Sequence, residues 1–236
     1  DASRRDFTIN ALYLNREGEL VDPLNGYADL LKKKVKFIGD PEERIKEDYL
    51  RVLRFFRFSV LYGAPDKYLD IDGLAACKYC LEGLKSLSAN RVWSELKLIL
   101  SSQNLKTVVP HLESSGVLEV IIPGFDTNNL EIFFKNEVAK KINLSPLIRL
   151  KMLTGTESRP CHSLFPFSSL EKKFLIDLER CIEEKTINSV IAYRYGELTA
   201  LGALLICSSK AGEYVTDEDI KAVKIGAKQV FPLRGE

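Results

Sequence analysis

The sequence has few of the residues that would indicate a disulfide-bonded, metal-binding or membrane-spanning protein. Its 236 residues include 5 cysteines and 2 histidines, and no apolar run approaches the roughly 20 residues that a membrane helix needs. An odd number of cysteines without regular spacing favours a reduced protein of the cytoplasm. Cys77 and Cys80 form an isolated CxxC, which favours two partly buried thiols on a helix over a zinc or redox site.

The chain also lacks an excess of charge of either sign. Its 34 basic and 33 acidic side chains leave a net charge of +1, so no overall positive field indicates a nucleic-acid partner. Any contact with a polyanion must therefore come from local clusters. A hydrophobic content of 45% with 28% charged residues is typical of a globular protein and excludes a disordered chain.

The first 38 residues favour β structure. Residues 7–14 predict a strand, 15–18 a turn, and 19–21 a hairpin partner. A second turn is expected at 22–26 and a short strand at 35–38. Because so few strands cannot bury a face, we expect them to form the edge of a sheet whose other strands lie upstream of this chain.

From Asp40 onwards the pattern is helical. Asp40 as N-cap, Pro41 at the first helical position and Glu43 two residues later predict a helix that continues to Gly63. Further helices are predicted at 72–82, 89–101, 104–114, 127–141, 145–153, 168–184, 196–208 and 216–228. The predicted fold class is mainly α, a helical array preceded by a small β remnant.

A ribbon of charged residues runs along the predicted helix 40–63, with Asp48, Arg51, Arg54 and Arg57 at three-residue intervals. A carboxylate can accept from the exocyclic amino group of cytosine or adenine, while a neighbouring guanidinium donates to the ring nitrogen. Uracil and guanine place a carbonyl oxygen there and are repelled. Such contacts discriminate by ~1–3 kcal/mol. The spacing alone equally permits an Asp48–Arg51 ion pair with the other arginines on a solvated face.

Several segments resemble one family in order and spacing. RRDFTINAL (4–12), the Asp22-Pro23 turn, IGDPEERI (38–45) and EDYLRVLRFFRF (47–58) together resemble the class II tRNA nucleotidyltransferase / poly(A) polymerase family. Residues 88–96 resemble the next family motif, with Asn90 where Glu is usual. The resemblance implies a chain that lacks the N-terminal part of the catalytic head and ends at the start of a tail element.

The resemblance also implies roles for individual residues. Arg5 and Asp6 belong to the nucleotide pocket, Asp48 and Arg51 act as a protein template for the base of CTP or ATP, and Arg54 and Arg57 are further nucleotide-binding positions. Arg91 and Glu95 brace the template helix. The implied division is a head edge at 1–39, a neck at 40–105, and a helical body with part of the tail at 106–236.

The metal carboxylates of the family, an Asp-x-Asp pair that binds Mg²⁺, are expected upstream of this chain, so we assign no catalytic or metal-binding residue here. Asp70/Asp72 and Asp217/Asp219 resemble such a pair. Both lie at predicted helix starts, where aspartate caps the helix and complements its dipole. The chain alone is therefore expected to be inactive.

The function implied is the addition of C and A to tRNA 3′ ends, with tRNA, CTP and ATP as partners and no membrane. A bacterial poly(A) polymerase is an alternative with a similar pocket. A non-catalytic RNA-binding module, left by gene splitting and completed by a separately encoded head, is another. Scattered basic residues could add to an RNA surface but are usually just solvated: Arg149, Lys151, Arg194 and Lys221.

Overall fold

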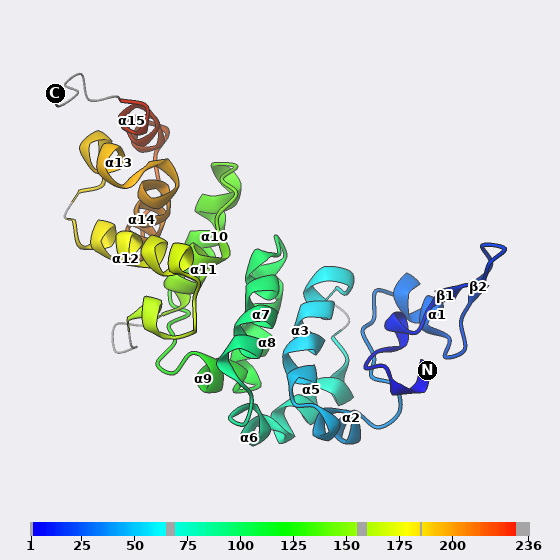
Figure 1. Ribbon diagram of the computed structural model, residues 1–236. Coiled ribbons are helices and arrows are strands. Elements are labelled where there is room, and N and C mark those ends of the chain that lie inside the picture. Colours follow the sequence, from blue (N-terminus) through cyan, green and yellow to red (C-terminus); the bar gives the residue numbers. More distant parts are fainter. Residues whose placement is uncertain (1, 65–68, 155–159, 185, 230–236) are drawn as a thin grey trace. The chain divides into compact units, whose positions relative to one another are not determined.

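The computed structural model describes residues 2–64, 69–154, 160–184 and 186–229. The chain forms two compact units, Asp1–Pro123 and Gly124–Glu236, and helices dominate both (Figure 1). The predicted mainly α fold class is confirmed. Within the described ranges, no helix is both long and apolar enough to cross a membrane.

The N-terminal segment of the first unit contains the predicted hairpin. Strands β1 (Tyr13–Leu14) and β2 (Leu20–Val21) pair antiparallel. The predicted strand at 7–12 is wrong, because a 3₁₀ turn, η2 (Thr8–Asn10), follows Asp6. The Asp6 carboxylate accepts from the Phe7 N–H at 3.1 Å and from the Asn10 amide at 2.8 Å, which folds the chain back. A further 3₁₀ turn, η1 (Ala2–Arg4), precedes it.

The predicted turn at 22–26 leads directly into a helix that the sequence did not indicate, α1 (Gly26–Leu31). The Asp22 carboxylate accepts from the N–H groups of Gly26 and Tyr27 at 2.8 and 2.9 Å. A Cβ at Gly26 would lie 2.1 Å from the Thr8 carbonyl oxygen. Glycine therefore allows α1 to pack closely on η2.

The remaining helices among the described residues of the first unit are α2 (Pro41–Glu47), α3 (Leu50–Tyr62), α5 (Ile71–Tyr79), α6 (Leu81–Leu84), α7 (Ala89–Ser101), α8 (Leu105–Ser114) and α9 (Val117–Ile121). The single helix predicted over 40–63 is wrong. Asp48 adopts an extended conformation (φ −159°, ψ 104°) that ends α2, and its carboxylate accepts from the Leu50 N–H at 3.1 Å. The helix predicted over 72–82 likewise divides at Cys80.

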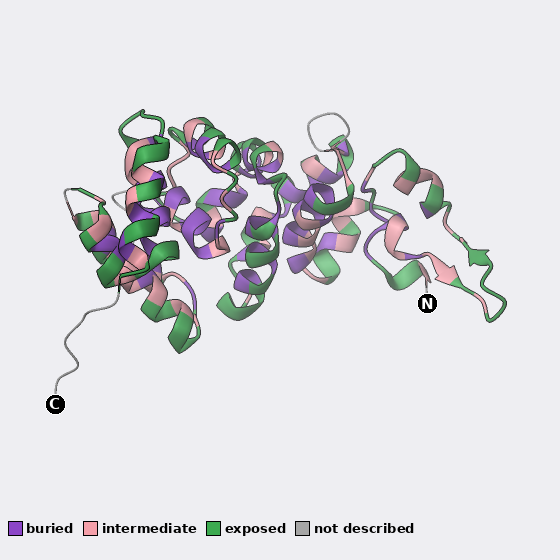
Figure 2. Cartoon of the chain, turned by 90° about the horizontal axis from the view of Figure 1, so that it is seen from above, coloured by how far each residue is buried: buried purple, intermediate pink, exposed green. Residues whose placement is uncertain are grey.

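An aromatic core joins the N-terminal segment to α3, and α7 packs beside α3. The ring centroids of Phe7 and Phe37 lie 4.8 Å apart, and those of Phe37 and Phe55 lie 5.5 Å apart. Phe55 and Trp93 are buried, as a core role predicts. Figure 2 shows buried residues along the helices of both units. Phe7 and Phe55, which stand 48 residues apart in the sequence, thus belong to one core. The polar side of α3 is left for the charged ribbon.

The second unit contains α10 (Leu130–Ala139), α11 (Pro146–Leu153), η3 (Cys161–Ser163), α12 (Ser169–Glu183), α13 (Ser189–Tyr195), α14 (Glu197–Lys210) and α15 (Asp217–Ala227). Buried residues run along most of α14, which packs against α10, α12, α13 and α15. Capping boxes at Ser168 and Thr216 begin α12 and α15 where the sequence predicted. A Cβ at Gly226 would lie 2.0 Å from the Ser189 carbonyl oxygen, so glycine lets α15 approach α13.

Candidate functional site

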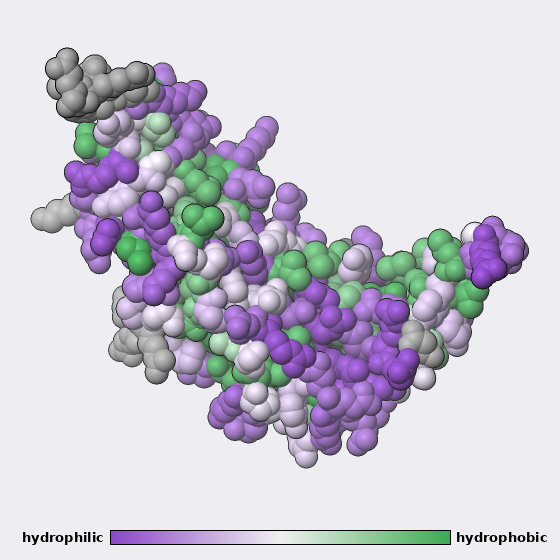
Figure 3. Space-filling model, in the orientation of Figure 1, coloured by the Kyte–Doolittle hydropathy of each residue, from purple (hydrophilic) through white to green (hydrophobic). Residues whose placement is uncertain are grey.

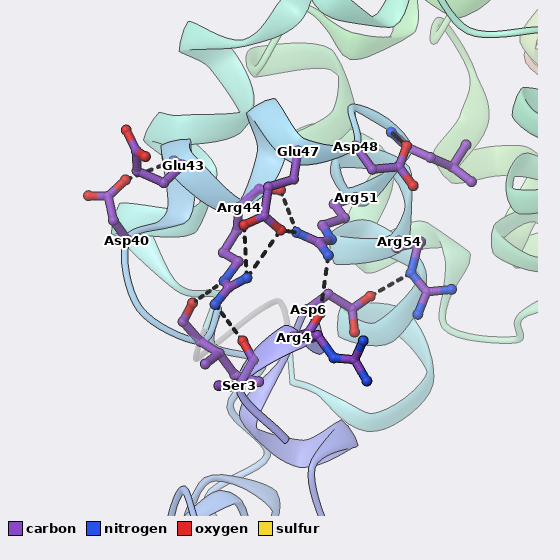
Figure 4. Close-up of polar contacts among 12 residues, drawn as sticks. Ser3, Arg4, Asp6, Asp40, Glu43, Arg44, Glu47, Asp48, Arg51 and Arg54 are labelled. Atoms are coloured by element: carbon purple, nitrogen blue, oxygen red, sulfur yellow. Dashed lines mark hydrogen bonds and ion pairs between the residues drawn. The ribbon is translucent and has the colours of Figure 1, made fainter. Parts of the chain in front are cut away.

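A cluster of charged side chains gathers where the N-terminal segment meets α2, α3 and α7 (Figure 4). Hydrophilic residues cover the visible surface over α2 and α5 (Figure 3). We call this group the charged cluster. It includes every residue that the sequence singled out except Arg5, and adds one that it did not: Asp6, Glu47, Asp48, Arg51, Arg54, Arg57, Arg91 and Glu95.

Arg51 is held from several sides at the corner between α2 and α3. It forms an ion pair with Glu47 and donates to the Arg44 carbonyl at 2.7 Å and the Arg4 carbonyl at 3.3 Å. The hydrogen bond from Arg51 lowers the pKa of Glu47 below its usual value, and Arg44 adds to this against the opposing effect of desolvation. These contacts hold the Arg51 guanidinium in position before any ligand arrives. They leave 15% of its side chain exposed.

Asp48 lies at the same corner but has a different partner. One carboxylate oxygen caps α3 and the other accepts from Nη2 of Arg91 on α7 at 2.8 Å. Its side chain remains 34% exposed. Among the described residues there is no Asp48–Arg51 ion pair, so that interpretation of the spacing is wrong. Each side chain is instead anchored separately, which leaves the base-reading interpretation as a prediction.

Asp6 and Arg54 connect the N-terminal segment to α3. Arg54 Nε lies 2.5 Å from Asp6 Oδ2, and Asp6 is only 4% exposed. Burial opposes ionisation of Asp6, but the hydrogen bonds from Arg54 and Asn10 outweigh it, so the pKa of Asp6 lies below its usual value of 3.8. Asp6 is thus a charged support beneath Arg54, which keeps 30% of its side chain exposed.

Glu95 on α7 contacts two arginines of α3, Arg54 and Arg57. Its Oε2 lies 3.2 Å from Arg57 Nε, and its Oε1 lies 3.9 Å from Arg54 Nη1. Burial raises the pKa of Glu95, while Arg57 and Arg54 work against that rise. The Glu95 carboxylate is only 9% exposed and Arg57 only 15%, so this pair lies mostly below the surface.

Arg5 lies at the edge of the cluster on the exposed side. Its guanidinium carbon is 5.6 Å from the centre of the Tyr13 ring on β1, a distance at which a cation is attracted to the ring face. Arg5 is exposed, whereas Asp6 next to it is buried.

The aspartate pairs that resemble a metal site have structural roles. Asp70 accepts from the Gly73 N–H at 3.0 Å as the N-cap of α5 and pairs with Lys34 at 3.0 Å. Asp219 forms a capping box with Thr216, and Asp217 pairs with Lys140. Throughout the described ranges no group of three or more His, Cys, Asp or Glu is placed to hold a metal ion. Cys77 and Cys80 are buried free thiols whose pKa values burial raises.

Two family models match parts of the chain. Residues 1–36 match "Poly A polymerase head domain", and residues 69–128 match "Probable RNA and SrmB- binding site of polymerase A". The mouse protein "CCA tRNA nucleotidyltransferase 1, mitochondrial" is 42% identical over 144 residues, which are 60% of this chain and 32% of that protein. A "CCA-adding enzyme" of Oceanobacillus iheyensis is 33% identical over 62% of this chain and 35% of its own length.

Solved structures share the fold. A CCA-adding enzyme of Bacillus stearothermophilus in complex with CTP matches with a TM-score of 0.75 and 20% identity, over 96% of this chain and 58% of that one. A Thermotoga maritima CCA-adding enzyme complexed with tRNA matches with a TM-score of 0.67 and 18% identity, over 100% of this chain and 62% of that one.

Together these matches indicate a class: the chain is similar to nucleotidyltransferases of the polymerase A type, and it matches one model of their head domain and one of an RNA-binding site. The predicted resemblance to the class II tRNA nucleotidyltransferase / poly(A) polymerase family is confirmed. The chain spans about a third of the length of the curated relatives named above. Nucleotidyltransferases of this family use divalent metals, and the described acids do not fit such a site, so no metal-dependent step is assigned to them.

Sequence reasoning missed one member of the charged cluster, Glu47, and its neighbour Arg44. Glu47 holds Arg51, and Arg44 holds Glu47 while its Nε donates to the Ile38 carbonyl at 3.0 Å. Glu47 is the last residue of α2, and Arg51 lies in the first turn of α3. The pair therefore forms across the break at Asp48, which sequence reasoning did not predict.

Proposed function

We propose that this chain supplies base selection and RNA binding to a tRNA nucleotidyltransferase that adds C and A to tRNA 3′ ends from CTP and ATP. The observation that carries the proposal is the separate anchoring of Asp48 and Arg51 at one corner, where both remain partly exposed. The relatives are named for CCA addition, and structures with the same fold are described with CTP, with ATP and with tRNA. No observation favours polyadenylation or a non-catalytic module.

In this proposal the corner imitates the pairing edge of a nucleotide. Asp48 accepts from the amino group of cytosine or adenine, and Arg51 donates to the neighbouring ring nitrogen. Separate anchors fix the two groups in place, so little freedom is lost when a base binds. Uracil and guanine would set a carbonyl oxygen against the Asp48 carboxylate, which is unfavourable.

The remaining members of the proposed nucleotide site are Arg5, Asp6, Arg54 and Arg57. Arg5 and Arg54 have the exposure needed to reach phosphate oxygens, and guanidinium groups suit phosphates. Asp6 is buried beneath Arg54, and Arg57 pairs with Glu95 on α7, so we propose that they act through these neighbours. Arg91 and Glu95 brace the α3 helix through Asp48 and Arg57.

Further parts of the proposal concern the rest of the protein. Mg²⁺ is the proposed metal, held by residues outside the described ranges. We retain the division into a head edge at 1–39, a neck at 40–105, and a body with part of the tail at 106–236 as part of the same proposal. The cytoplasm remains the predicted compartment, although three of the relatives are named as mitochondrial.

Arg51→Ala tests the base-selecting role. The assay uses a protein that joins this chain to the head of a CCA-adding relative, and compares the incorporation of C, A, U and G into tRNA lacking its 3′ end. Loss of one base-reading contact, worth ~1–3 kcal/mol, should reduce discrimination against UTP and GTP by about tenfold to a hundredfold. Unchanged misincorporation, with C and A still added, would contradict the role.

Arg91→Ala tests the bracing role in the same assay. Because Arg91 and Asp48 are 49% and 34% exposed, the loss of their ion pair should change the free energy of unfolding by less than about 1 kcal/mol. Freed of its anchor, Asp48 should still select bases, so discrimination should fall by less than in Arg51→Ala. A loss as large as that of Arg51→Ala would argue for a direct contact of Arg91 with the nucleotide.

A further inference from the structure

The short helix α6 carries a glycine that lies directly against an aromatic ring at the corner between α2 and α3. A Cβ placed on Gly83 would lie 2.0 Å from Cδ1 and Cε1 of Tyr49 and 2.4 Å from its Cγ. Tyr49 is the N-cap residue of α3 and stands between Asp48 and Leu50. The ring that rests on Gly83 therefore belongs to the residue next to the proposed base-reading carboxylate.

The segment that carries Gly83 is itself held in place. Cys80, which separates α5 from α6, and Leu84, the last residue of α6, are both buried. The Ser86 hydroxyl donates to the Gly83 carbonyl at 2.7 Å, and α6 packs against α9. Because Gly83 lies between two buried residues, α6 offers the Tyr49 ring a fixed surface.

The same stretch of chain meets the corner a second time, eight residues further on. Arg91, in the first turn of α7, donates to the Asp48 carboxylate at 2.8 Å. Gly83 and Arg91 therefore contact two neighbouring residues, Tyr49 through its ring and Asp48 through its charge. Asp48 interrupts the helix with φ −159° and ψ 104°, so contacts on both residues help to fix its position.

We propose that Gly83 and Tyr49 are positioning residues for base selection, with the ring acting as a spacer between α6 and the corner. The proposal rests on the proposed function, because it concerns the same base-reading pair, Asp48 and Arg51. It follows that only glycine at position 83 leaves the ring where it is. The larger the displacement of the ring, the less well the corner should match the edge of a base.

The size of the displacement can be stated. Carbon atoms in contact need a separation of about 3.5 Å, so a methyl group at position 83 would require the Tyr49 ring to move by roughly 1.5 Å. Rotation about the Cβ–Cγ bond leaves Cγ where it is, 2.4 Å from that methyl group. Relief therefore requires a different χ1 rotamer or a shift of the Tyr49 backbone. Either change disturbs the corner at which Asp48 and Arg51 are held.

Gly83→Ala tests the proposal in the protein that joins this chain to the head of a CCA-adding relative. Discrimination against UTP and GTP should fall by about tenfold, since a misplacement of about 1 Å can cost up to about a hundredfold. The loss should appear mainly as a higher KM for CTP and ATP, because Asp48 and Arg51 are proposed to contact the base and not the reacting phosphate. A merely structural defect would lower kcat and the folded fraction without changing which base is added.

Two further variants separate the steric effect from a general loss of structure. In Tyr49→Ala/Gly83→Ala the ring is gone, so the double variant should discriminate no worse than Tyr49→Ala alone. Gly202→Ala is the matched control, because a Cβ at this glycine of α14 would lie 2.6 Å from Ile148 Cδ1, in the second unit. Its discrimination between bases should equal that of the unaltered protein.

A second measurement uses the 236-residue chain itself and needs no activity. The NMR signals of the Nε–H groups of Arg51 and Arg91 should shift in Gly83→Ala and stay in place in Gly202→Ala. Unshifted signals in Gly83→Ala, or additive losses in the double variant, would overturn the proposal. If Gly83→Ala kept full discrimination while Arg51→Ala lost it, only this inference would fail. If Arg51→Ala kept it as well, the proposed function would fail with it, so the two failures are distinguishable.

Discussion

Asp6→Asn should lower the free energy of unfolding by about 2 kcal/mol at neutral pH. Removal of one partner from a buried ion pair typically costs ~3–5 kcal/mol because the other charge is left without compensation. Arg54 keeps 30% of its side chain exposed, so water offsets part of that cost. Urea unfolding followed by circular dichroism measures the change.

The pH dependence identifies the cause. The folded pKa of Asp6 lies below its usual value of 3.8, so the stabilisation is complete above that usual value and is lost as the pH falls through the folded pKa. The difference between the wild-type chain and Asp6→Asn should be constant from neutral pH down to about pH 5 and should shrink below about pH 4. If this difference in the free energy of unfolding stayed the same in acid, the charge of Asp6 would not contribute to stability.

Asp40→Asn is the matched control. Asp40 is exposed and its carboxylate accepts from the Glu43 N–H at 2.9 Å as the N-cap of α2. Asparagine is about as good an N-cap as aspartate. The same chemical change at this position should therefore alter the free energy of unfolding by less than about 0.5 kcal/mol, which separates the buried pair from the general effect of removing a charge.

Much of the fold could be predicted because its signals are local. Helix caps such as Ser168 and Thr216, and apolar residues at helical spacing, give most helices of the second unit nearly their observed bounds. The hairpin follows from a glycine turn between short apolar segments. The break at Asp48 could not be predicted, because a carboxylate that caps the next helix looks the same in sequence as one on a continuous helix.

The site was predictable in its members but not in its pairings. The three-residue spacing identifies Asp48, Arg51, Arg54 and Arg57, yet their partners are mostly distant in sequence. Asp6 pairs with Arg54 across 48 residues, and Glu95 with Arg57 across 38. These pairs exist because the aromatic core brings the N-terminal segment against α3, and α7 packs beside α3.

Glu95→Ala should have the largest effect on the free energy of unfolding, a loss of about 3 kcal/mol. It removes the only acid that contacts Arg57 among the described residues and one of two that contact Arg54. Arg57 is more deeply buried than Arg54, so water compensates less, and a buried guanidinium without an acceptor is costly. Chemical unfolding at neutral pH measures the loss, and a change below about 1 kcal/mol would show that Arg57 finds water instead.

Glu95→Gln should cost much less, because burial raises the pKa of Glu95 even though two arginines oppose the rise. Folding thus disfavours the charged carboxylate relative to the unfolded chain, and glutamine carries no charge while still accepting a hydrogen bond. The sign of the pH dependence is opposite to that of Asp6. With a folded pKa above the usual 4.5, the wild-type chain should gain stability over Glu95→Gln as the pH falls from the folded pKa towards 4.5. The opposite outcome is that the wild-type chain loses stability relative to both Asp6→Asn and Glu95→Gln as the pH falls. The charged cluster would then be one cooperative network of ion pairs, and Glu95 would hold α3 chiefly by its charge.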